Sequence, residues 1–123
     1  MKTQSFLLNI TSEDPARMAA FYGDVMKLSP NPVIGEGAFD LLPGLTLHID
    51  GHSSTHGMAK EPQRMMLDFF VDDLASEQAR LKSKGVQFIR EAGKEEWGGV
   101  ISTFLDPDGN YCQLIEFNAE EAH

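Results

Sequence analysis

The chain has 123 residues, of which 41% are hydrophobic and 24% charged, and 10 basic against 19 acidic residues give a net charge of −9. This composition is typical of one globular domain with a real core. Phosphate backbones and anionic lipids repel an acidic chain that lacks a basic stripe, so nucleic acid and membrane partners are not expected. The apolar runs are far shorter than the roughly 18 residues of a membrane span. One cysteine, Cys112, suits a reducing compartment, so we expect a cytoplasmic protein.

The first half of the sequence predicts a strand, a helix and three further strands. Apolar and β-branched residues over 5–12 predict the first strand, and Ser12-Glu13-Asp14-Pro15 predicts a helix start, because an oxygen-bearing cap followed by proline favours the first turn. Apolar residues at three-to-four spacing then predict a helix face, which prolines 30 and 32 are expected to end. Three short strands are expected around Val33-Ile34, 38–42 and 45–49.

The second half repeats this pattern after a polar connector over about 51–63. The repeat divides residues 1–123 into module one, about 1–50, and module two, about 64–118. In module two a strand is expected over 64–71, followed by a helix capped by Asp72-Asp73 and closed by Gly85. Asp106-Pro107-Asp108-Gly109-Asn110 predicts a tight hairpin turn. The remaining strands are expected at 86–89, 99–105 and 111–117.

Two residue spacings support an internal duplication. The helix-capping residues Asp14 and Asp73 are 59 positions apart (73 − 14), and the turn glycines Gly44 and Gly109 are 65 apart (109 − 44). Two copies of one βαβββ unit explain both spacings. We therefore expect an α+β fold in a single domain, with two curved four-stranded sheets around a shared cleft and the helices outside. Strand edges and apolar faces that a symmetric partner can cover favour a homodimer.

Three motifs resemble the vicinal oxygen chelate superfamily, which includes glyoxalase I, bleomycin-resistance proteins, extradiol dioxygenases and fosfomycin-modifying enzymes. They are Asp14-Pro15 followed by Phe21-Tyr22-Gly23-Asp24-Val25-Met26, the triplet Trp97-Gly98-Gly99, and the 106–110 turn followed by Gln113-Leu114-Ile115-Glu116. The resemblance spans nearly the whole chain. It implies the fold more specifically than the reaction, because this scaffold hosts many chemistries.

The resemblance also implies a divalent metal held by four side chains, on the first and last strands of each module. Carried over to this chain, the first-strand positions are Leu7 and Met66, and the last-strand positions are His48 and Gln113. Leucine has no donor atom, a thioether is too soft for a hard ion, and a neutral amide is a weak donor. Moving the register by one residue brings only apolar side chains to the first-strand positions. We therefore expect no metal cofactor, although a divalent ion completed by substrate oxygens stays open.

Strand alternation and the resemblance together nominate residues that would line the cleft. His48 titrates near neutrality and could contact a ligand or transfer a proton, but a strand histidine is more often structural. Asp68 stands among apolar residues, where a carboxylate is costly without a partner. It could orient His48, receive a cation, or sit half-exposed at a strand end. Trp97, next to two glycines, would cap the cleft or pack in the core. Phe39, Phe70 and Tyr111 are, taken singly, more often core residues than ligand platforms, but an aromatic lining with a few polar groups is typical of a small-molecule cleft. The candidate ligand-binding residues are Leu7, Asn9, Phe39, His48, Met66, Asp68, Phe70, Trp97, Tyr111 and Gln113.

Other chemistry-bearing residues have simpler interpretations. His52 and His56 are four apart, but no helical pattern supports a metal pair there. Cys112 alternates with Gln113 and is expected to be a packed thiol. His123 lies at the end of the sequence and is expected to be disordered.

Three functions fit these observations. The first is metal-independent binding or sequestration of a small organic molecule, with the net charge favouring a cationic aromatic one. The second is a metal-dependent lyase, isomerase or dioxygenase of the same superfamily. The third is a non-catalytic partner subunit. The sequence assigns no catalytic residue, and it leaves open whether the protein is an enzyme.

Overall fold

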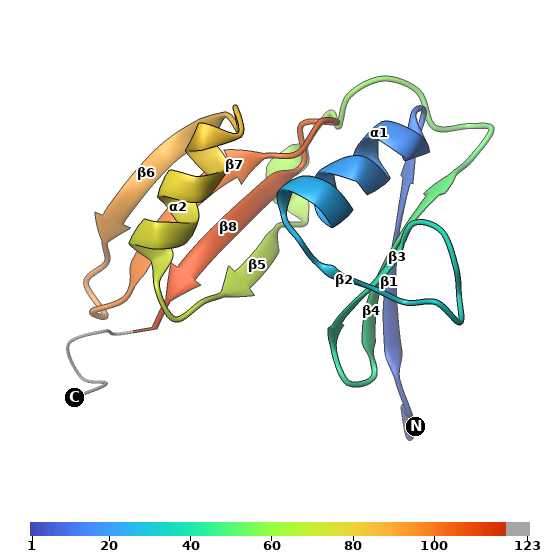
Figure 1. Cartoon of the computed structure of the whole chain (residues 1–123), viewed down its shortest axis with the longest axis horizontal. Helices are drawn as coiled ribbons and strands as arrows, with labels where there is room; N and C mark the ends of the chain where they lie inside the picture. The colour runs from blue at the N-terminus through green and yellow to red at the C-terminus, as the bar shows by residue number, and fades with distance from the viewer. Residues whose placement is uncertain (118–123) are drawn as a thin grey trace. The chain divides into compact units, whose positions relative to one another are not determined.

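The structure is a computed structural model that describes residues 1–117. The chain divides into two compact units, unit 1 (Met1–Gly57) and unit 2 (from Met58). Each unit has a four-stranded sheet and a helix (Figure 1). The predicted α+β class and the two repeated modules are thereby confirmed. Among residues 1–117, no helix is long and apolar enough to cross a membrane.

Unit 1 is built on a sheet with strand order β1-β4-β3-β2, in which β1 and β4 are parallel and the other pairs antiparallel. The α-helix begins after Asp14, whose carboxylate accepts a hydrogen bond from the Arg17 amide at 3.2 Å, and Pro15 occupies the first turn. A π-helical turn continues it. The elements are β1 (Phe6–Ser12), α1 (Pro15–Ala20), η1 (Phe21–Val25), β2 (Ser29–Pro30), β3 (Ala38–Leu42) and β4 (Leu45–Gly51).

Unit 2 repeats this design with strand order β5-β8-β7-β6, in which β5 and β8 are parallel. Its helix begins after Asp73, whose carboxylate accepts a hydrogen bond from the Ser76 amide at 3.1 Å. The elements are η2 (Pro62–Arg64), β5 (Leu67–Phe70), α2 (Leu74–Ser83), β6 (Phe88–Lys94), β7 (Val100–Leu105) and β8 (Tyr111–Glu116).

The two units share the details that the spacings predicted. Asp14 and Asp73 cap equivalent helices through the same type of bond. Gly44 and Gly109 occupy equivalent turns with φ of 77° and 84°, a left-handed conformation that a side chain strains. Duplication therefore accounts for the turns as well as for the order of elements.

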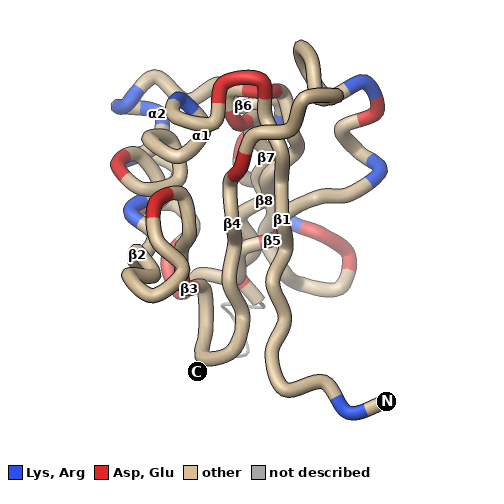
Figure 2. The backbone as a smooth tube through the Cα atoms, turned by 90° about the vertical axis from the view of Figure 1, so that its right-hand side faces the viewer, with Lys and Arg blue, Asp and Glu red and all other residues tan. Residues whose placement is uncertain are grey.

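The core of each unit lies between its helix and one face of its sheet. In unit 1 it contains Met18 and Tyr22 from the helical segment with Leu47 and Ile49 from β4. In unit 2 the helix supplies Leu74 and Leu81, and the sheet supplies Leu67, Phe104, Cys112 and Leu114. Cys112 is the packed thiol that was expected. Charged residues concentrate outside the strands of unit 1, and β1 carries none (Figure 2).

Two predictions for unit 1 are wrong. Val33 and Ile34 form an exposed turn rather than a strand, because the Asn31 carboxamide accepts hydrogen bonds from both their amides, at 3.0 and 2.9 Å. The short strand is Ser29–Pro30 instead, at the sheet edge where proline is tolerated. The helix was also expected to end at prolines 30 and 32, but the helical segment already ends at Met26. The next residue, Lys27, takes a left-handed φ of 62°.

In unit 2 the strand expected over 64–71 is shorter. Pro62–Arg64 forms a 3-10 turn, and β5 begins only at Leu67, so Met66 precedes the strand. The strand expected over 86–89 begins later and runs from Phe88 to Lys94. His123 lies outside the described residues.

Candidate functional site

Each sheet has one face packed on its helix and an opposite face, which we call the open face. In β8, Cys112 and Leu114 are buried on the helix side, so Gln113 between them belongs to the open face. Strand pairing places four polar residues in register across the open face of unit 2, one on each strand. This polar row consists of Asp68 (β5), Gln113 (β8), Thr103 (β7) and Arg90 (β6).

Hydrogen bonds engage three of the four residues of the polar row. The Gln113 amide nitrogen donates to the hydroxyl of the buried Thr103 at 3.0 Å. The Arg90 guanidinium donates to Glu95 at 3.3 Å. Asp68 has no hydrogen bond or ion pair with any residue of the described chain, and desolvation raises the pKa of its carboxyl. The row thus leaves one carboxylate without a partner at the β5 edge of the sheet.

An aromatic cluster of Phe70, Phe117 and Trp97 lies beside the polar row. Phe70 is two residues after Asp68 and therefore on the same face of β5. Its ring centroid is 6.3 Å from that of Phe117, which in turn is 5.6 Å from that of Trp97. These side chains are 64%, 70% and 49% exposed, respectively. Three large aromatic side chains that pack on one another yet stay accessible are typical of a binding surface.

The absence of a side chain at Gly99 makes room for the indole of Trp97. A Cβ atom built on Gly99 would overlap the six-membered ring of Trp97. The indole therefore lies directly on the backbone of the hairpin between β6 and β7, where only glycine leaves it room. Trp97 was expected either to cap the cleft or to pack in the core. Its exposure excludes packing in the core.

The open face of unit 1 presents the equivalent positions with different chemistry. Asn9 and His48 are direct partners on β1 and β4, as Asp68 and Gln113 are on β5 and β8. His48 is half-buried and Leu7 is 41% exposed. Here an amide and an imidazole replace the carboxylate and the amide of unit 2.

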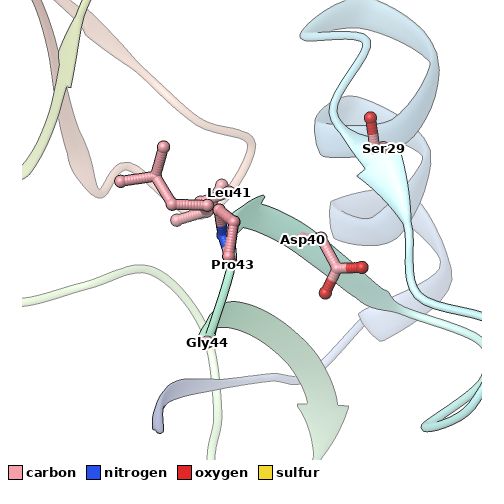
Figure 3. Close-up of a pocket in the computed structure, with 6 residues that line it drawn as sticks. Ser29, Asp40, Leu41, Pro43 and Gly44 are labelled. Atoms are coloured by element: carbon pink, nitrogen blue, oxygen red, sulfur yellow. The ribbon is translucent and has the colours of Figure 1, made fainter.

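Unit 1 also contains an open pocket of about 360 Å³ at the β3–β4 hairpin (Figure 3). Its one charged group, Asp40, already accepts hydrogen bonds from Asn31 at 2.8 Å and from Thr46 at 3.4 Å. The other lining residues are Ser29, Leu41, Leu42, Pro43 and Gly44. None of the residues nominated from the sequence lines it, and we assign it no function.

The structure divides the nominated residues by unit. Asp68, Phe70, Tyr111 and Gln113 belong to the open face of unit 2, and Trp97 adjoins it. Leu7, Asn9 and His48 belong to the open face of unit 1, and Met66, 46% exposed, precedes β5. Phe39 is different, because it is buried against Gly23 of the helical segment. We therefore place Phe39 in the core and leave it out of the proposed site.

Three residues of the polar row and the aromatic cluster were not predicted from the sequence: Thr103, Arg90 and Phe117. Thr103 could have been found from the 106–110 hairpin, since counting back from that turn pairs it with Gln113. Arg90 could not, because the β6–β7 pairing is irregular on both sides of it. Phe117 follows the last strand and carries no motif.

The four positions at which this fold would hold a divalent metal carry unsuitable side chains. Leu7 and Met66 offer no hard donor, and Gln113 turns its amide nitrogen to Thr103. Among residues 1–117, no three or more His, Cys, Asp or Glu side chains are grouped as a metal site. The residues present therefore do not fit a divalent ion.

His52 and His56 make separate contacts. The His52 Nδ1 atom accepts a hydrogen bond from the Ser54 amide at 3.0 Å, whereas His56 Nδ1 lies 3.5 Å from Glu13. The Nδ1 atoms of the two histidines thus have different partners.

Comparison with known proteins identifies the class. The model of the Glyoxalase/Bleomycin resistance protein/Dioxygenase superfamily matches residues 6–114. The chain belongs to this superfamily, in agreement with the resemblance in its motifs. No curated protein matches the sequence.

Solved structures share the fold at low sequence identity. A glyoxalase/bleomycin resistance protein/dioxygenase family enzyme from Burkholderia phytofirmans PsJN is 19% identical, with a TM-score of 0.72 over 89% of this chain and 95% of that one. A member of the superfamily from Sphaerobacter thermophilus DSM 20745 is 16% identical, with a TM-score of 0.71 over 94% and 98%. TnmS3, an antibiotic binding protein from Streptomyces sp. CB03234, is 20% identical, with a TM-score of 0.68 over 94% and 96%.

Proposed function

We propose that this protein binds a small organic molecule through an aromatic group, without a metal ion, on the open face of unit 2. The observation that carries the proposal is the exposed aromatic cluster of Phe70, Phe117 and Trp97 beside the unpartnered carboxylate of Asp68. A planar ligand would cover apolar surface that water now contacts. Burying about 100 Å² of that surface contributes roughly 2.5 kcal/mol before the entropic cost of association.

Two observations support binding rather than metal-dependent catalysis. The four positions where the fold would hold a divalent ion lack suitable donors, as described above. A structural neighbour, TnmS3, is an antibiotic binding protein, so this fold includes a protein that binds an organic molecule. The alternative is a metal-dependent lyase, isomerase or dioxygenase. It is less well supported, because the four expected metal-ligand positions supply only one imidazole, His48, and one amide, Gln113.

The experiment is a titration of chelator-treated protein with 2-naphthamide, a neutral aromatic probe, followed by NMR. We expect saturable binding that Phe70→Ala and Phe117→Ala weaken severalfold. Val33→Ala is the matched control, because Val33 is also an exposed apolar residue, at 91%, but lies in a turn of unit 1. Binding that requires an added divalent ion would contradict the proposal. So would stoichiometric Ni, Zn, Mn or Fe in the purified protein that disappears in His48→Ala.

We further propose that the protein is a homodimer of the cytoplasm. The edge strand β1 exposes a large apolar side chain, Phe6, at 59%. Exposed edges and apolar side chains of this kind are what a symmetric partner covers. Light scattering after size exclusion should give twice the chain mass, and a monomer at micromolar concentration would contradict the dimer.

A further inference from the structure

We propose, on the basis of the binding function above, that the site prefers aromatic ligands carrying a cation rich in N–H donors, a primary ammonium or an amidinium, held jointly by Asp68 and Gln113. These two residues are direct partners on the parallel strands β5 and β8. Adjacent strands are about 4.8 Å apart, so both side chains reach one small polar group.

Thr103 determines which atom of the Gln113 side chain is offered to a ligand. Thr103 lies on β7, on the side of β8 away from β5, and the Gln113 amide nitrogen donates to its hydroxyl at 3.0 Å. With the nitrogen bonded to Thr103, the carbonyl oxygen is the Gln113 atom left to accept a hydrogen bond from a ligand. Thr103 is only 4% exposed, so water has little access to replace this bond. The Asp68 carboxylate and the Gln113 carbonyl oxygen therefore form a pair of side-chain acceptors on neighbouring strands.

A pair of acceptors selects among ligands by their donors. An amidinium has two parallel N–H groups and a primary ammonium has three, and either can bond a carboxylate and an amide oxygen together. A quaternary ammonium carries the same charge but has no N–H to donate. A carboxylate ligand would place oxygen against oxygen. The arrangement thus favours donor-rich cations over both.

The positive charge of the polar row does not neutralise Asp68. Arg90 lies three strands away, about 14 Å by strand spacing, and its guanidinium is paired with Glu95 at 3.3 Å. The aromatic cluster is closer, since the Cα atoms of Asp68 and Phe70 are about 6.8 Å apart along an extended strand. One aromatic amidine can therefore place its ring on Phe70 and its cation at Asp68.

The test compares dissociation constants of three probes that share one ring: 2-naphthamidine, trimethyl(2-naphthylmethyl)ammonium and neutral 2-naphthamide. NMR titrations of the full chain give the ratio of affinities within each variant, which does not depend on the folded fraction. We expect the amidine to bind about tenfold more tightly than the trimethylammonium compound, as charge-assisted hydrogen bonds imply. Asp68→Asn should bring this ratio close to one and Thr103→Val should lower it severalfold, whereas Thr103→Ser, which keeps the acceptor, should preserve it.

The matched control is Glu91→Gln. It removes one negative charge from the same sheet, but the Glu91 carboxylate pairs with Lys82 of α2, on the helix side. This variant should keep the wild-type ratio. If Thr103→Val fails to fold, Gln113→Met tests the same acceptor and should lower the ratio.

The outcomes separate the two proposals. Equal affinities for the amidine and the trimethylammonium compound, with 2-naphthamide still binding, would overturn the donor preference and leave aromatic binding intact. A wild-type ratio in Thr103→Val would also overturn it. Failure of all three probes to bind would overturn the proposed function itself.

Discussion

The ionised side chain of Asp68 destabilises the folded protein, so its effect on the free energy of unfolding depends on pH. Partial desolvation raises the pKa of the Asp68 carboxyl in the folded protein above its ordinary range. The native state then holds a proton more strongly than the unfolded state, so stability falls as pH rises through this window, and the loss is complete above the folded pKa. At pH 7 we expect Asp68→Asn to have a slightly higher melting temperature than wild type. This advantage should disappear as pH falls below the pKa of an aspartate in the unfolded chain, about 3.9.

Asp72→Asn controls for the general relief of negative charge, because Asp72 is also exposed and lies outside the proposed site. Differential scanning fluorimetry of the three proteins at several pH values measures the effect. A gain for Asp68→Asn that is the same at pH 3.5 and pH 7, or no larger than that of Asp72→Asn, would contradict the assignment.

Gly99 supports the aromatic cluster without contacting a ligand. Gly99→Ala places a methyl group where the indole of Trp97 now lies, so the indole must move and its packing on Phe117 must change. We expect a changed emission maximum of Trp97, the chain's one tryptophan, and severalfold weaker binding of 2-naphthamide. Gly98 is not a suitable control because its φ is 96°, but Gly93→Ala tests another glycine of the same hairpin. Wild-type emission and affinity in Gly99→Ala would show that the indole position is unimportant.

The candidate site was partly predictable residue by residue. Alternation along the strands, with Cys112 packed inward, placed Gln113 outward, and the apolar neighbours of Asp68 marked it as an unusual carboxylate. Phe39 was nominated as part of an aromatic lining, with core packing as the alternative, and the structure buries it. Sequence could not decide between the two, because which face of β3 carries the helix depends on tertiary packing. The contact between Phe70 and Phe117 joins residues 47 positions apart (117 − 70), and no local pattern encodes it.

Strand β7 contains a buried side-chain hydroxyl that makes no hydrogen bond within the described residues. The Ser102 side chain is fully buried on the helix side of unit 2, and its hydroxyl has no hydrogen-bond partner among the described residues. Replacing it with alanine removes this desolvated group at little change in volume. We expect Ser102→Ala to raise the free energy of unfolding by about 1 kcal/mol. That gain corresponds to roughly 4 °C in melting temperature.

Thr103→Ala is the informative comparison for Ser102→Ala. Thr103 is the next residue of β7, but its hydroxyl accepts a hydrogen bond from Gln113, so its removal should destabilise the protein. Chemical denaturation of both variants gives the two signs. A loss of stability in Ser102→Ala comparable with that in Thr103→Ala would show that the Ser102 hydroxyl has a partner after all.

At the scale of elements, the sequence predicted what local chemistry controls. The helix starts at Asp14 and Asp73 and the turns at Gly44 and Gly109 follow from capping and left-handed glycine. Strand ends were less predictable. Val33 and Ile34 are β-branched, yet the side chain of Asn31 captures their amides, and this competition between side chain and ladder is invisible to strand propensity.

For the whole molecule, net charge sets a long-range preference that adds to the contacts at the site. A charge of −9 attracts cations and is screened by salt over about 8 Å at physiological ionic strength. We expect the affinity for 2-naphthamidine to fall about threefold between 20 and 200 mM NaCl, whereas that for neutral 2-naphthamide should stay constant. Isothermal titration calorimetry measures both. An equal salt response of the two compounds would rule out an electrostatic contribution.

The central claim is that the open face of unit 2 binds an aromatic ligand with no metal present. The most direct measurement is a set of intermolecular nuclear Overhauser effects between 2-naphthamide and chelator-treated protein. We predict contacts from the naphthyl protons to Phe70, Trp97 and Phe117. Contacts that arise only after a divalent ion is added, or that lead to residues outside this cluster, would contradict the account.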